Sequence, residues 1–404
     1  MVNTLLKKPF IKGEKVIRQI EKHGFKAYFV GGCVRDLIIG RSIGDIDIAT
    51  SATPKELQRI FQSVIPVGIE HGTVIVRWER DSFEITTFRL DDTYSDQRHP
   101  DNVQFVQTIE QDLKRRDFTM NAIAMDINGQ TTDPYGGMQD IQRKQIRAVG
   151  HASDRFWEDP LRIVRAVRFS SQLGFSIEKN TLKDMLDVKN QIHSLAVERL
   201  LVEVTKLFAG NFINKGLAYL GEADIYNEFP VFKNHPEIKG VLPKYWTPLQ
   251  SFGEVIMVLH TLYPVVSIAE WIEEWKASNK VKQEAQTLAQ AFHYFESHGL
   301  NAWFAYILPA SYVHKFIRVA HMVMDEPFLR PEDIERLQWR LPIQSKRDLQ
   351  LNGSDLLHLF PYRKKGAWIG ETLDKMEQAV VNGELTNSKH ELRKWLLCHL
   401  PEEN

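Results

Sequence analysis

One segment near the start of the chain, residues 28–50, combines a pair of adjacent glycines with two closely spaced aspartates. An apolar, β-prone run over 28–30 stops at the glycine pair 31–32, and apolar residues then recur at helical spacing over 34–39. A second β-prone run, 45–49, alternates strictly between aspartate and apolar residues. The segment therefore predicts a strand, a tight turn, a short helix and a second strand.

The two aspartates, Asp45 and Asp47, lie two residues apart on the second predicted strand. Successive side chains of a strand point to opposite faces, so both carboxylates share one face while Ile46 and Ile48 share the other. Two carboxylates about 7 Å apart on a stiff strand can bind a cluster of divalent cations. A lone Asp-x-Asp pattern is more often a solvated strand end, so its interpretation depends on its surroundings.

The glycine pair provides the surroundings expected for a bound phosphate. Glycines leave their backbone N–H groups bare, and the helix that follows brings its N-terminus to the same end of the sheet. Arg35 adds a positive charge one turn into that helix. The whole segment thus contains the parts of a metal-dependent phosphoryl or nucleotidyl transfer site.

A chain of 404 residues is too long for one compact core and predicts two to four domains. Its formal net charge is −1, so any contact with a nucleic acid has to come from local basic patches. The only cysteines, Cys33 and Cys398, exclude a disulfide framework and a Cys-x-x-Cys zinc site. No targeting segment or long apolar run is recognisable, and we expect a cytoplasmic protein without membrane contact.

Residues 53–61 predict a helix that begins with a capping box and a proline. A β-hairpin follows, with arms over 73–78 and 83–89. Glu84 on the second arm is a third acidic group if that arm neighbours the strand of the two aspartates, and a surface pairing residue otherwise. The polar segment 91–102 has no apolar period and predicts a long loop, of a length that is usually functional or disordered.

The segment 112–125 predicts a helix capped by Asp117, with Arg115 and Arg116 directly before it. Positive charge at a helix N-terminus is unfavourable by roughly 0.3–1 kcal/mol. The arrangement is therefore typical of a place where an anion, such as a triphosphate, is bound.

A closing strand is predicted over 144–149, and β character ends at about residue 151. Residues 156–169 then predict a helix with Asp159 as N-cap and Pro160 in the first helical position. At about 100° per residue, arginines at every third position fall within an arc of about 120°. They form one basic stripe, made of Arg162, Arg165 and Arg168. The alternative is a solvated helix face on which Asp159 serves only as a cap.

Asp159 and Arg162, one turn apart, have complementary hydrogen-bonding capacities. An ionised aspartate only accepts and an arginine only donates. Cytosine and adenine each present an amino donor beside a ring-nitrogen acceptor, whereas guanine and uracil present the opposite order. The pair can therefore bind C and A and reject G and U without a template, since each unpaired polar edge in a buried site costs about 1–3 kcal/mol.

Beyond residue 221 the chain predicts an aromatic-rich helical region, in which Trp271, Ile272 and Trp275 have the spacing of core residues. Residues 361–368 mix three cations with two aromatic side chains. This composition is typical of a surface that contacts an RNA backbone, or of an exposed loop. The cations are Arg363, Lys364 and Lys365.

Four motifs occur in order: G-G-x-x-R-D, D-x-D, R-R-D-F-T-x-N-A and E-D-P-L-R-x-x-R-A-x-R-F. The first two resemble the nucleotidyltransferase superfamily, which includes polymerase β, poly(A) polymerases and CCA-adding enzymes. All four together resemble the bacterial class II CCA-adding enzymes, which are tRNA nucleotidyltransferases, over residues 20–210. The helical remainder is similar only in length and character. That family usually has a serine before the Glu–Arg of its neck motif, and residues 195–199 lack it.

The resemblance implies a role for each of nine residues. The metal ligands would be Asp45 and Asp47, with Mg²⁺ as the cofactor. Gly32 and Arg35 would hold the triphosphate, and Arg116 the phosphate or ribose. The base would be read by Asp159 and Arg162, with the nucleotide supported by Arg165 and Arg168.

The fold implied by the resemblance is α+β. It consists of a small mixed-sheet nucleotidyltransferase head over 1–150, a helical neck for base recognition over 151–220, a helical body over 221–335 and a helical tail that contacts tRNA over 336–404. The implied activity is template-independent addition of C, C and A from CTP and ATP to the 3′ end of tRNA, with release of pyrophosphate. The long 91–102 loop, which CC-adding relatives shorten, favours full CCA addition.

Three alternative functions stay open at this point. Two belong to the same class, a poly(A) polymerase and a partial CC- or A-adding enzyme. The third is a catalytically silent RNA-binding homologue, against which the intact acidic pair and the arginine stripe argue. A homodimer is also left open.

Overall fold

The computed structural model describes residues 8–91, 103–324 and 329–399. The chain divides into two compact units, Met1–Lys239 and Gly240–Asn404. Apart from its first residue, the predicted loop 91–102 lies outside the described residues, and the four-part division into head, neck, body and tail stays a prediction. None of the described helices is long and apolar enough to cross a membrane.

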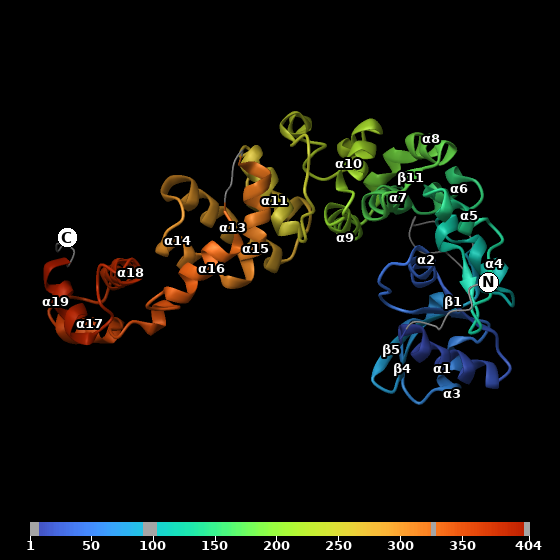
Figure 1. Cartoon of the computed structure of the whole chain (residues 1–404), viewed down its shortest axis with the longest axis horizontal. Helices are drawn as coiled ribbons and strands as arrows, with labels where there is room; N and C mark the ends of the chain where they lie inside the picture. Colours follow the sequence, from blue (N-terminus) through green and yellow to red (C-terminus); the bar gives the residue numbers. More distant parts are fainter. Residues whose placement is uncertain (1–7, 92–102, 325–328, 400–404) are drawn as a thin grey trace. The chain divides into compact units, whose positions relative to one another are not determined.

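The N-terminal part of the first unit contains a seven-stranded sheet (Figure 1). Its strands are β1 (Ala27–Val30), β2 (Asp47–Thr50), β3 (Val64–Gly68), β4 (Thr73–Trp78), β5 (Asp81–Thr87), β8 (Ala124–Met125) and β9 (Thr131–Thr132). They lie in the order β3-β4-β5-β2-β1-β8-β9. β2 and β5 are parallel and the other neighbours are antiparallel, so the sheet is mixed, as predicted.

One face of this sheet packs against α1 (Lys8–Lys22), and α3 (Pro54–Ile60) lies against α1. The ring centroids of Phe10 in α1 and Phe29 in β1 are 4.8 Å apart, and both side chains are fully buried. A Cβ atom added to Gly13 would lie 2.7 Å from the Phe29 ring and 3.2 Å from Ile46. The apolar residues of the Asp-x-Asp segment therefore face α1, and the aspartates face the other side.

The opposite face is covered over β1 by an apolar cluster to which α4 (Ile109–Lys114) contributes. The buried members are Val30, Ala49, Phe88, Val106, Ile109, Leu113, Ala122, Ala124 and Val149. Over the start of β2 and the middle of β5 the same face carries Asp47 and Glu84 in place of apolar side chains. The polar part of this face is where the site lies.

The predicted turn and caps around the first motif are confirmed. The helix α2 (Gly32–Ile39) follows the glycine pair and ends at Gly40, which has a left-handed φ of 79° and donates to the carbonyls of Asp36 and Leu37. Thr53 and Glu56 form the reciprocal capping box at the start of α3. Local sequence signals thus place β1, α2 and α3 correctly, whereas β2 begins at Asp47, two residues later than predicted, and Asp45 lies before it.

The helix predicted to follow Asp117 within the segment 112–125 does not form. α4 ends at Lys114, and the residues after it form only the 3₁₀ turn η2 (Thr119–Asn121). Arg115 and Arg116 therefore follow a helix C-terminus, where positive charge is favourable. Asp117 caps no helix, because its carboxylate is used by side chains from other elements.

The closing strand predicted over 144–149 is also wrong in extent and partner. Only β10 (Gln145–Ile146) forms, and it pairs in parallel with β11 (Ser176–Ile177), outside the seven-stranded sheet. β structure therefore continues beyond residue 151. A third small sheet joins β6 (Arg89–Asp91) to β7 (Val103–Phe105).

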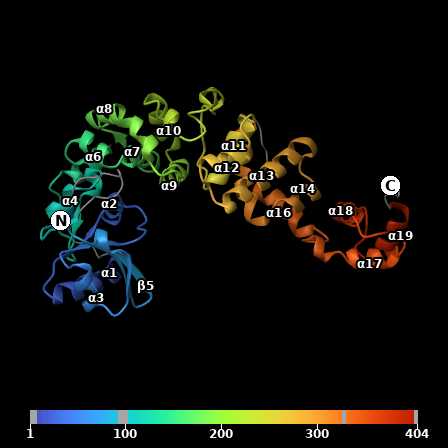
Figure 2. The same cartoon turned by 180° about the vertical axis from the view of Figure 1, so that it is seen from behind.

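The rest of the first unit is helical (Figure 2). Its helices are α5 (Gly137–Gln142), α6 (Ala152–Glu158), α7 (Leu161–Leu173), α8 (Lys179–Val188), α9 (Val197–Phe208) and α10 (Ile213–Glu222). α7 packs against both α9 and α10. A Cβ atom on Gly210 would lie 2.1 Å from Ser171 Oγ, so glycine is required where the chain after α9 crosses α7. This close approach holds α9 beside the arginine-bearing helix.

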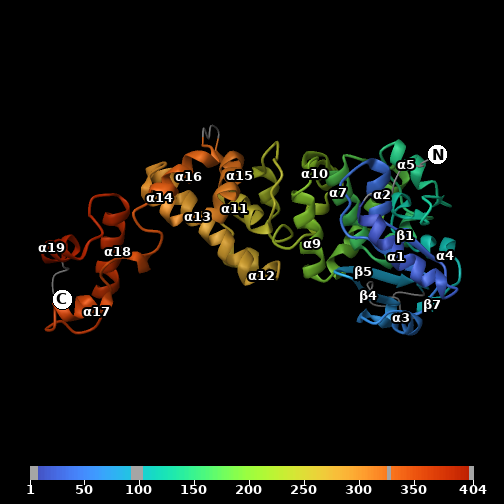
Figure 3. The same ribbon diagram turned by 60° about the horizontal axis from the view of Figure 1, so that its bottom comes forward.

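The second unit is helical throughout its described residues (Figures 1 and 3). Its α-helices are α11 (Phe252–Leu262), α12 (Ile268–Glu274), α13 (Asn279–His298), α14 (Ala302–Ile307), α15 (Val313–Val323), α16 (Pro331–Arg340), α17 (Gly353–Leu359), α18 (Trp368–Val381) and α19 (Lys389–His399). Trp271 and Trp275 are almost fully buried, as their spacing predicted. The remaining 3₁₀ segments of the chain are η1 (Ile69–His71), η3 (Lys189–Ser194), η4 (Ile225–Glu228), η5 (Pro236–Val241), η6 (Ala310–Tyr312) and η7 (Lys346–Asp348).

Candidate active site

The acidic groups of the site lie on β2, on β5 and just before β2. Asp47 is the first residue of β2, and Asp45 is exposed in the chain that precedes it. The parallel pairing of β2 with β5 places Asp47 opposite Glu84. Paired residues of neighbouring strands share a face, so both carboxyl groups point to the same side of the sheet. The condition for interpreting Glu84 as a third acidic group is therefore met.

Asp47 is in an environment that disfavours its ionised form. Burial raises the pKa of Asp47 to about 6, with further upward contributions from Glu84 and Asp45 and a downward one from Arg116. Among the described residues, no group of three or more His, Cys, Asp or Glu side chains is arranged to hold a metal ion. Mg²⁺ usually uses one or two carboxylates together with substrate phosphates. The donor set therefore fits a cation that is shared with a bound nucleotide.

The turn before α2 requires glycine. Gly31 has φ 72° and ψ −131°, and a Cβ atom there would lie 2.9 Å from Arg116 Nη1. A cavity of about 550 Å³ lies beside this turn. Its wall includes Gly31, Gly32, Arg35, Asp45, Asp47, Arg116 and Arg168. The first motif thus brings bare backbone, cations and acidic groups to one cavity.

Arg35 is buried within α2 and held from two sides. Its Nη1 donates to Asn121 Oδ1 at 2.7 Å, and its Nε donates to Asp36 Oδ1 at 3.0 Å. The guanidinium carbon lies 5.0 Å from the centroid of the Phe169 ring. These contacts fix the position of the charge at the cavity wall.

The two arginines after α4 are held by one buried carboxylate. Arg115 Nη2 lies 2.8 Å from Asp112 Oδ1, and Arg116 Nη2 lies 3.2 Å from Asp112 Oδ2. Burial alone would raise the pKa of Asp112, but the two arginines outweigh it and the pKa is lowered. Asp112 therefore stays ionised and anchors both cations.

The arginine stripe of α7 faces the protein and not the solvent. Arg162 and Arg168 are only 8% and 7% exposed, so the alternative of a solvated helix face is wrong. Arg165 lies 2.6 Å from Asp117 Oδ2, and Arg168 forms an ion pair with Glu203 of α9. The stripe is thus a buried row of paired charges.

Asp159 and Arg162 line a second cavity, of about 350 Å³, but each is paired with another residue. Asp159 Oδ2 accepts from Arg199 Nη2 at 2.8 Å, whereas Arg162 Nη1 donates to Glu158 Oε2 at 2.7 Å. α7 begins at Leu161, one residue later than predicted, and Asp159 Oδ1 accepts from the Leu161 N–H at 3.2 Å. Asp159 is therefore more than a cap.

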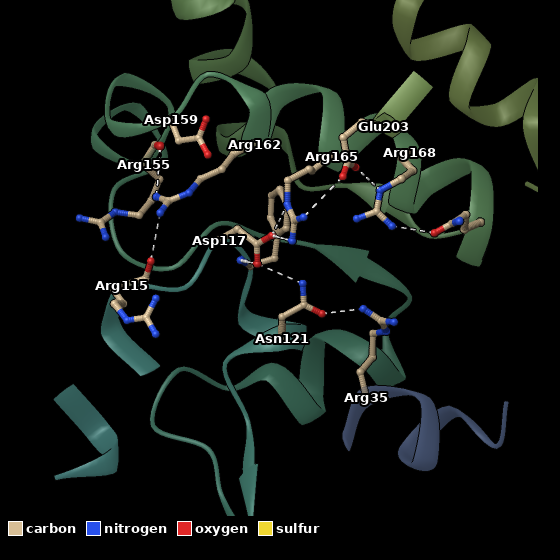
Figure 4. Close-up of polar contacts among 12 residues, drawn as sticks. Arg35, Arg115, Asp117, Asn121, Arg155, Asp159, Arg162, Arg165, Arg168 and Glu203 are labelled. Atoms are coloured by element: carbon tan, nitrogen blue, oxygen red, sulfur yellow. Dashed lines mark hydrogen bonds and ion pairs between the residues drawn. The ribbon is translucent and has the colours of Figure 1, made fainter. Parts of the chain in front are cut away.

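A continuous chain of polar contacts includes five residues of the wall of the larger cavity (Figure 4). It runs from Arg35 through Asn121, Asp117, Arg165 and Glu203 to Arg168. Burial alone would raise the pKa of Asp117, but Arg165 and Asn121 outweigh it and hold the pKa far below its usual range. Asp117 is therefore an ionised centre to which α7 and the turn η2 are both bound.

The predicted tail cations lie in the second unit, between α17 and α18. Lys364 and Lys365 are exposed, and the guanidinium carbon of Arg363 is 5.4 Å from the centroid of the Trp368 ring. Tyr362 is 97% exposed. The segment is an exposed loop that presents cations and aromatic rings together.

Sequence reasoning missed three residues that hold the site together. Glu158, Arg199 and Glu203 each pair with a predicted site residue. One signal was available, because positions 199 and 203 are one turn apart on a helix with a buried apolar face. Their partners on α7 could not be assigned without the packing of α9 against that helix.

Three protein-family models match this chain. The model of the poly(A) polymerase head domain matches residues 27–147. The model described as the probable RNA and SrmB-binding site of polymerase A matches residues 174–235. The model of tRNA nucleotidyltransferase domain 2 matches residues 250–396. Together the three matches extend from the sheet to the last described helix.

Curated relatives match over the full length. The CCA-adding enzyme of Oceanobacillus iheyensis is 46% identical over 401 residues, which cover 99% of this chain and 100% of the relative. The CCA-adding enzyme of Geobacillus kaustophilus is 40% identical over 397 residues, covering 97% and 98%. Among solved structures, the Bacillus stearothermophilus CCA-adding enzyme in complex with CTP matches with a TM-score of 0.86 at 36% identity, covering 97% of this chain and 98% of that chain.

Proposed function

This chain belongs to the family of CCA-adding enzymes, and from that premise we propose that it adds C, C and A to the 3′ end of tRNA. Its substrates would be CTP, ATP and tRNA, and pyrophosphate would be released. One observation in the structure carries this proposal at the level of the site. Asp47, Arg116, Asp117 and Arg165 line both cavities, so the acidic groups and the base-reading pair adjoin one continuous space.

We propose that Asp45 and Asp47 hold Mg²⁺ at the reacting end of this space. When bound, the ion would lower the pKa of the attacking hydroxyl and stabilise charge on the phosphates. The raised pKa of Asp47, which results first from burial and then from Glu84, supports the assignment, because a bound cation would favour the ionised carboxylate in this environment. Glu84, opposite Asp47, is the third acidic group in this proposal.

We assign the phosphates to the larger cavity. The Gly32 backbone and the Arg35 side chain would bind the triphosphate where α2 begins, and Arg116 would contact phosphate or ribose. Arg165 and Arg168 would support the nucleotide from the side of α7. All four arginines are held by carboxylate or amide partners, so little ordering is needed when the nucleotide binds.

We assign the base to the smaller cavity. Asp159 would accept from the amino group of cytosine or adenine, and Arg162 would donate to the neighbouring ring nitrogen. The low exposure of Arg162 supports this role, because a buried polar group left unpaired costs about 1–3 kcal/mol. Uracil and guanine present the reverse order and would be refused on that ground.

The test is a product ladder, resolved to one nucleotide, on a tRNA that lacks its CCA end. With CTP and ATP we expect three successive additions, C, C and A. A long A tail would instead indicate a poly(A) polymerase. A product that receives only the two C residues, or only A on a tRNA that already ends in CC, would indicate a partial enzyme. Asp45→Ala and Asp47→Ala should each abolish both C and A addition while tRNA binding is kept, because the phosphate contacts of the tRNA lie elsewhere. Near-normal turnover in either variant contradicts the metal assignment.

The exposed loop with Arg363, Lys364 and Lys365 is our candidate for a tRNA contact outside the site.

Because tRNA is a cytoplasmic substrate in bacteria, we place the activity in the cytoplasm. We further propose that the segment 91–102, of which only residue 91 is described, adjusts the site between C and A addition. Trimming 92–98 to a short glycine linker should leave C addition largely intact and reduce A addition.

A further inference from the structure

The larger cavity has one cationic wall residue to which none of the motifs assigns a function. Lys206 lies in the last turn of α9 and lines the same cavity as Gly32, Arg35 and Asp45. Its side chain is exposed, and within the described part of the chain its ammonium group has no hydrogen-bond or ion-pair partner. Lys206 is thus an uncommitted cation beside the proposed phosphate position.

The face of α9 that carries Lys206 is directed at the site. Arg199, Glu203 and Lys206 are spaced by four and three residues, so they lie on one face of the helix. Arg199 contacts Asp159, and Glu203 contacts Arg165 and Arg168. Lys206 continues this row by one further turn, toward the cavity that contains the glycine turn.

The other cations of the cavity are already engaged. Each pairs with a carboxylate: Arg35 with Asp36, Arg116 with Asp112, Arg165 with Asp117 and Arg168 with Glu203. Their charge is therefore partly offset by carboxylates before any ligand enters. A nucleoside triphosphate brings several negative charges, and Lys206 offers a positive charge that forms no ion pair with any described carboxylate.

We propose that Lys206 binds the terminal phosphates of the incoming nucleotide and then the same phosphates as departing pyrophosphate. This inference rests on the proposed function and adds a binding residue to it. Lys206 lines the larger cavity but not the smaller one, which contains Asp159 and Arg162. Its contact is therefore with phosphate and not with the base, and CTP and ATP are affected equally.

The test uses the full-length chain with Lys206→Gln, Lys206→Arg and a matched control, Lys183→Gln. Lys183 is an exposed lysine on α8 that lines neither cavity. We measure KM for CTP and for ATP on tRNA lacking its CCA end, and binding of inorganic pyrophosphate by calorimetry in Mg²⁺-containing buffer. Thermal unfolding checks that each variant is folded.

Lys206→Gln should raise the KM for CTP and the KM for ATP by the same factor, about tenfold, and weaken pyrophosphate binding to a similar extent. Tenfold corresponds to the lower part of the range of free energies found for hydrogen bonds to charged groups. Lys206→Arg should bring the KM values and the pyrophosphate affinity most of the way back to those of the parent chain. Lys183→Gln should have the same KM values and pyrophosphate affinity as the parent chain. Unchanged KM and pyrophosphate binding in Lys206→Gln overturns the proposal, as does an effect on one nucleotide only. If the parent chain adds no CCA, the proposed function fails, and pyrophosphate binding still decides the role of Lys206.

Discussion

Arg199 on α9 donates from Nη2 to Asp159 Oδ2 at 2.8 Å, so the predicted base-reading aspartate is held by a residue 40 positions further along the chain. The contact fixes the Oδ2 atom of Asp159. The Oδ1 atom lies at the start of α7, where it accepts a hydrogen bond from the Leu161 N–H. An aspartate held in this way presents a defined acceptor to the cavity. We therefore propose that Arg199 is a positioning residue for base selection, provided that Asp159 reads the base.

Replacing Arg199 should relax the choice of nucleotide more than it slows addition of the correct one. In Arg199→Gln, Asp159 keeps its charge but loses its strongest partner, so we expect misincorporation of UTP and GTP to rise by roughly tenfold, about 1.4 kcal/mol of discrimination. Arg199→Lys should restore part of the selectivity. The measurement is kcat/KM for all four nucleotides, with exposed Arg143→Gln as the control. Equal loss for every nucleotide contradicts a positioning role.

The same pairing predicts what happens when the two base readers are exchanged. In Asp159→Arg with Arg162→Asp, the arginine introduced at position 159 meets Arg199, and the aspartate introduced at position 162 meets Glu158. Like charges in a partly buried site are unfavourable, so we expect this double variant to be weakly active.

Adding Glu158→Gln and Arg199→Gln removes both repulsions. The resulting fourfold variant should prefer UTP and GTP over CTP and ATP, because the donor and acceptor positions are reversed. Single-nucleotide incorporation assays with each nucleotide measure the preference. If the fourfold variant is folded and still prefers CTP and ATP, Asp159 and Arg162 do not read the base.

The parts of the fold that sequence patterns predicted are those fixed by neighbouring residues. Gly31 adopts a positive φ in the turn before α2, Gly40 ends α2, and Thr53 with Glu56 starts α3. Alternation along β2 placed Asp47 on the polar face, although the strand begins two residues later than predicted and leaves Asp45 before it, and hairpin signals placed Glu84 on a strand. Each of these features depends on residues within a few positions of one another.

The errors concern features that depend on distant residues. Asp117 had the local pattern of a helix cap, but Arg165, 48 positions later, binds its carboxylate, and only a 3₁₀ turn forms after it. The alternative of a solvated arginine face was consistent with the spacing of Arg168, but this side chain is buried and forms an ion pair with Glu203, 35 positions later on α9. A single sequence gives no signal for such pairings before the packing of the helices is known.

Asp47 should destabilise the metal-free protein at neutral pH. Its pKa is raised from an unfolded value near 3.8 to about 6. Below pH ~3.8 the carboxyl is protonated in both states and the stability it contributes is fully present. This stability is lost as the pH rises through ~6. Asp47→Asn should therefore raise the free energy of unfolding at pH 8, by at most about 3 kcal/mol since partial exposure screens the effect, and by little at pH 4.

Urea denaturation in the presence of a chelator measures this difference. Asp45→Asn is the matched control, because Asp45 is exposed and its loss should abolish activity without a gain in stability. An Asp47→Asn variant that is no more stable than the parent at pH 8 contradicts the argument.

The exposed loop before α18 should contribute to tRNA affinity through charge. Replacing Arg363, Lys364 and Lys365 by glutamine should weaken tRNA binding and reduce the salt dependence of the affinity by up to about three counterions. The control replaces three exposed cations of the first unit, Arg143, Lys179 and Lys183, by glutamine. The measurement is the dissociation constant at several salt concentrations. If the slope of log affinity against log salt concentration is unchanged in the triple variant, the loop does not contact the tRNA backbone.

Asp117 should be the most acid-sensitive support of the site. Its pKa lies far below the usual range because Arg165 and Asn121 outweigh the effect of burial. A lowered pKa contributes stability that is present above the unfolded value of about 3.9 and is lost as the pH falls toward the folded one. Asp117→Asn removes this contribution and leaves Arg165 without a charged partner at that position.

We therefore expect Asp117→Asn to lower the free energy of unfolding at pH 7 by about 3–5 kcal/mol, the usual cost of breaking a buried ion pair. The free energies of unfolding of Asp117→Asn and the parent chain should become more similar as the pH is lowered from 5 to 3. Because Asp117 connects Arg35 and Arg165 through the contacts in Figure 4, a folded Asp117→Asn variant should also show higher KM values for both CTP and ATP. Denaturation at each pH and initial rates at pH 7 measure the two effects, with Asp126→Asn, which lies on a turn and lines neither cavity, as the control. A difference in stability that stays constant with pH contradicts the role of ionised Asp117.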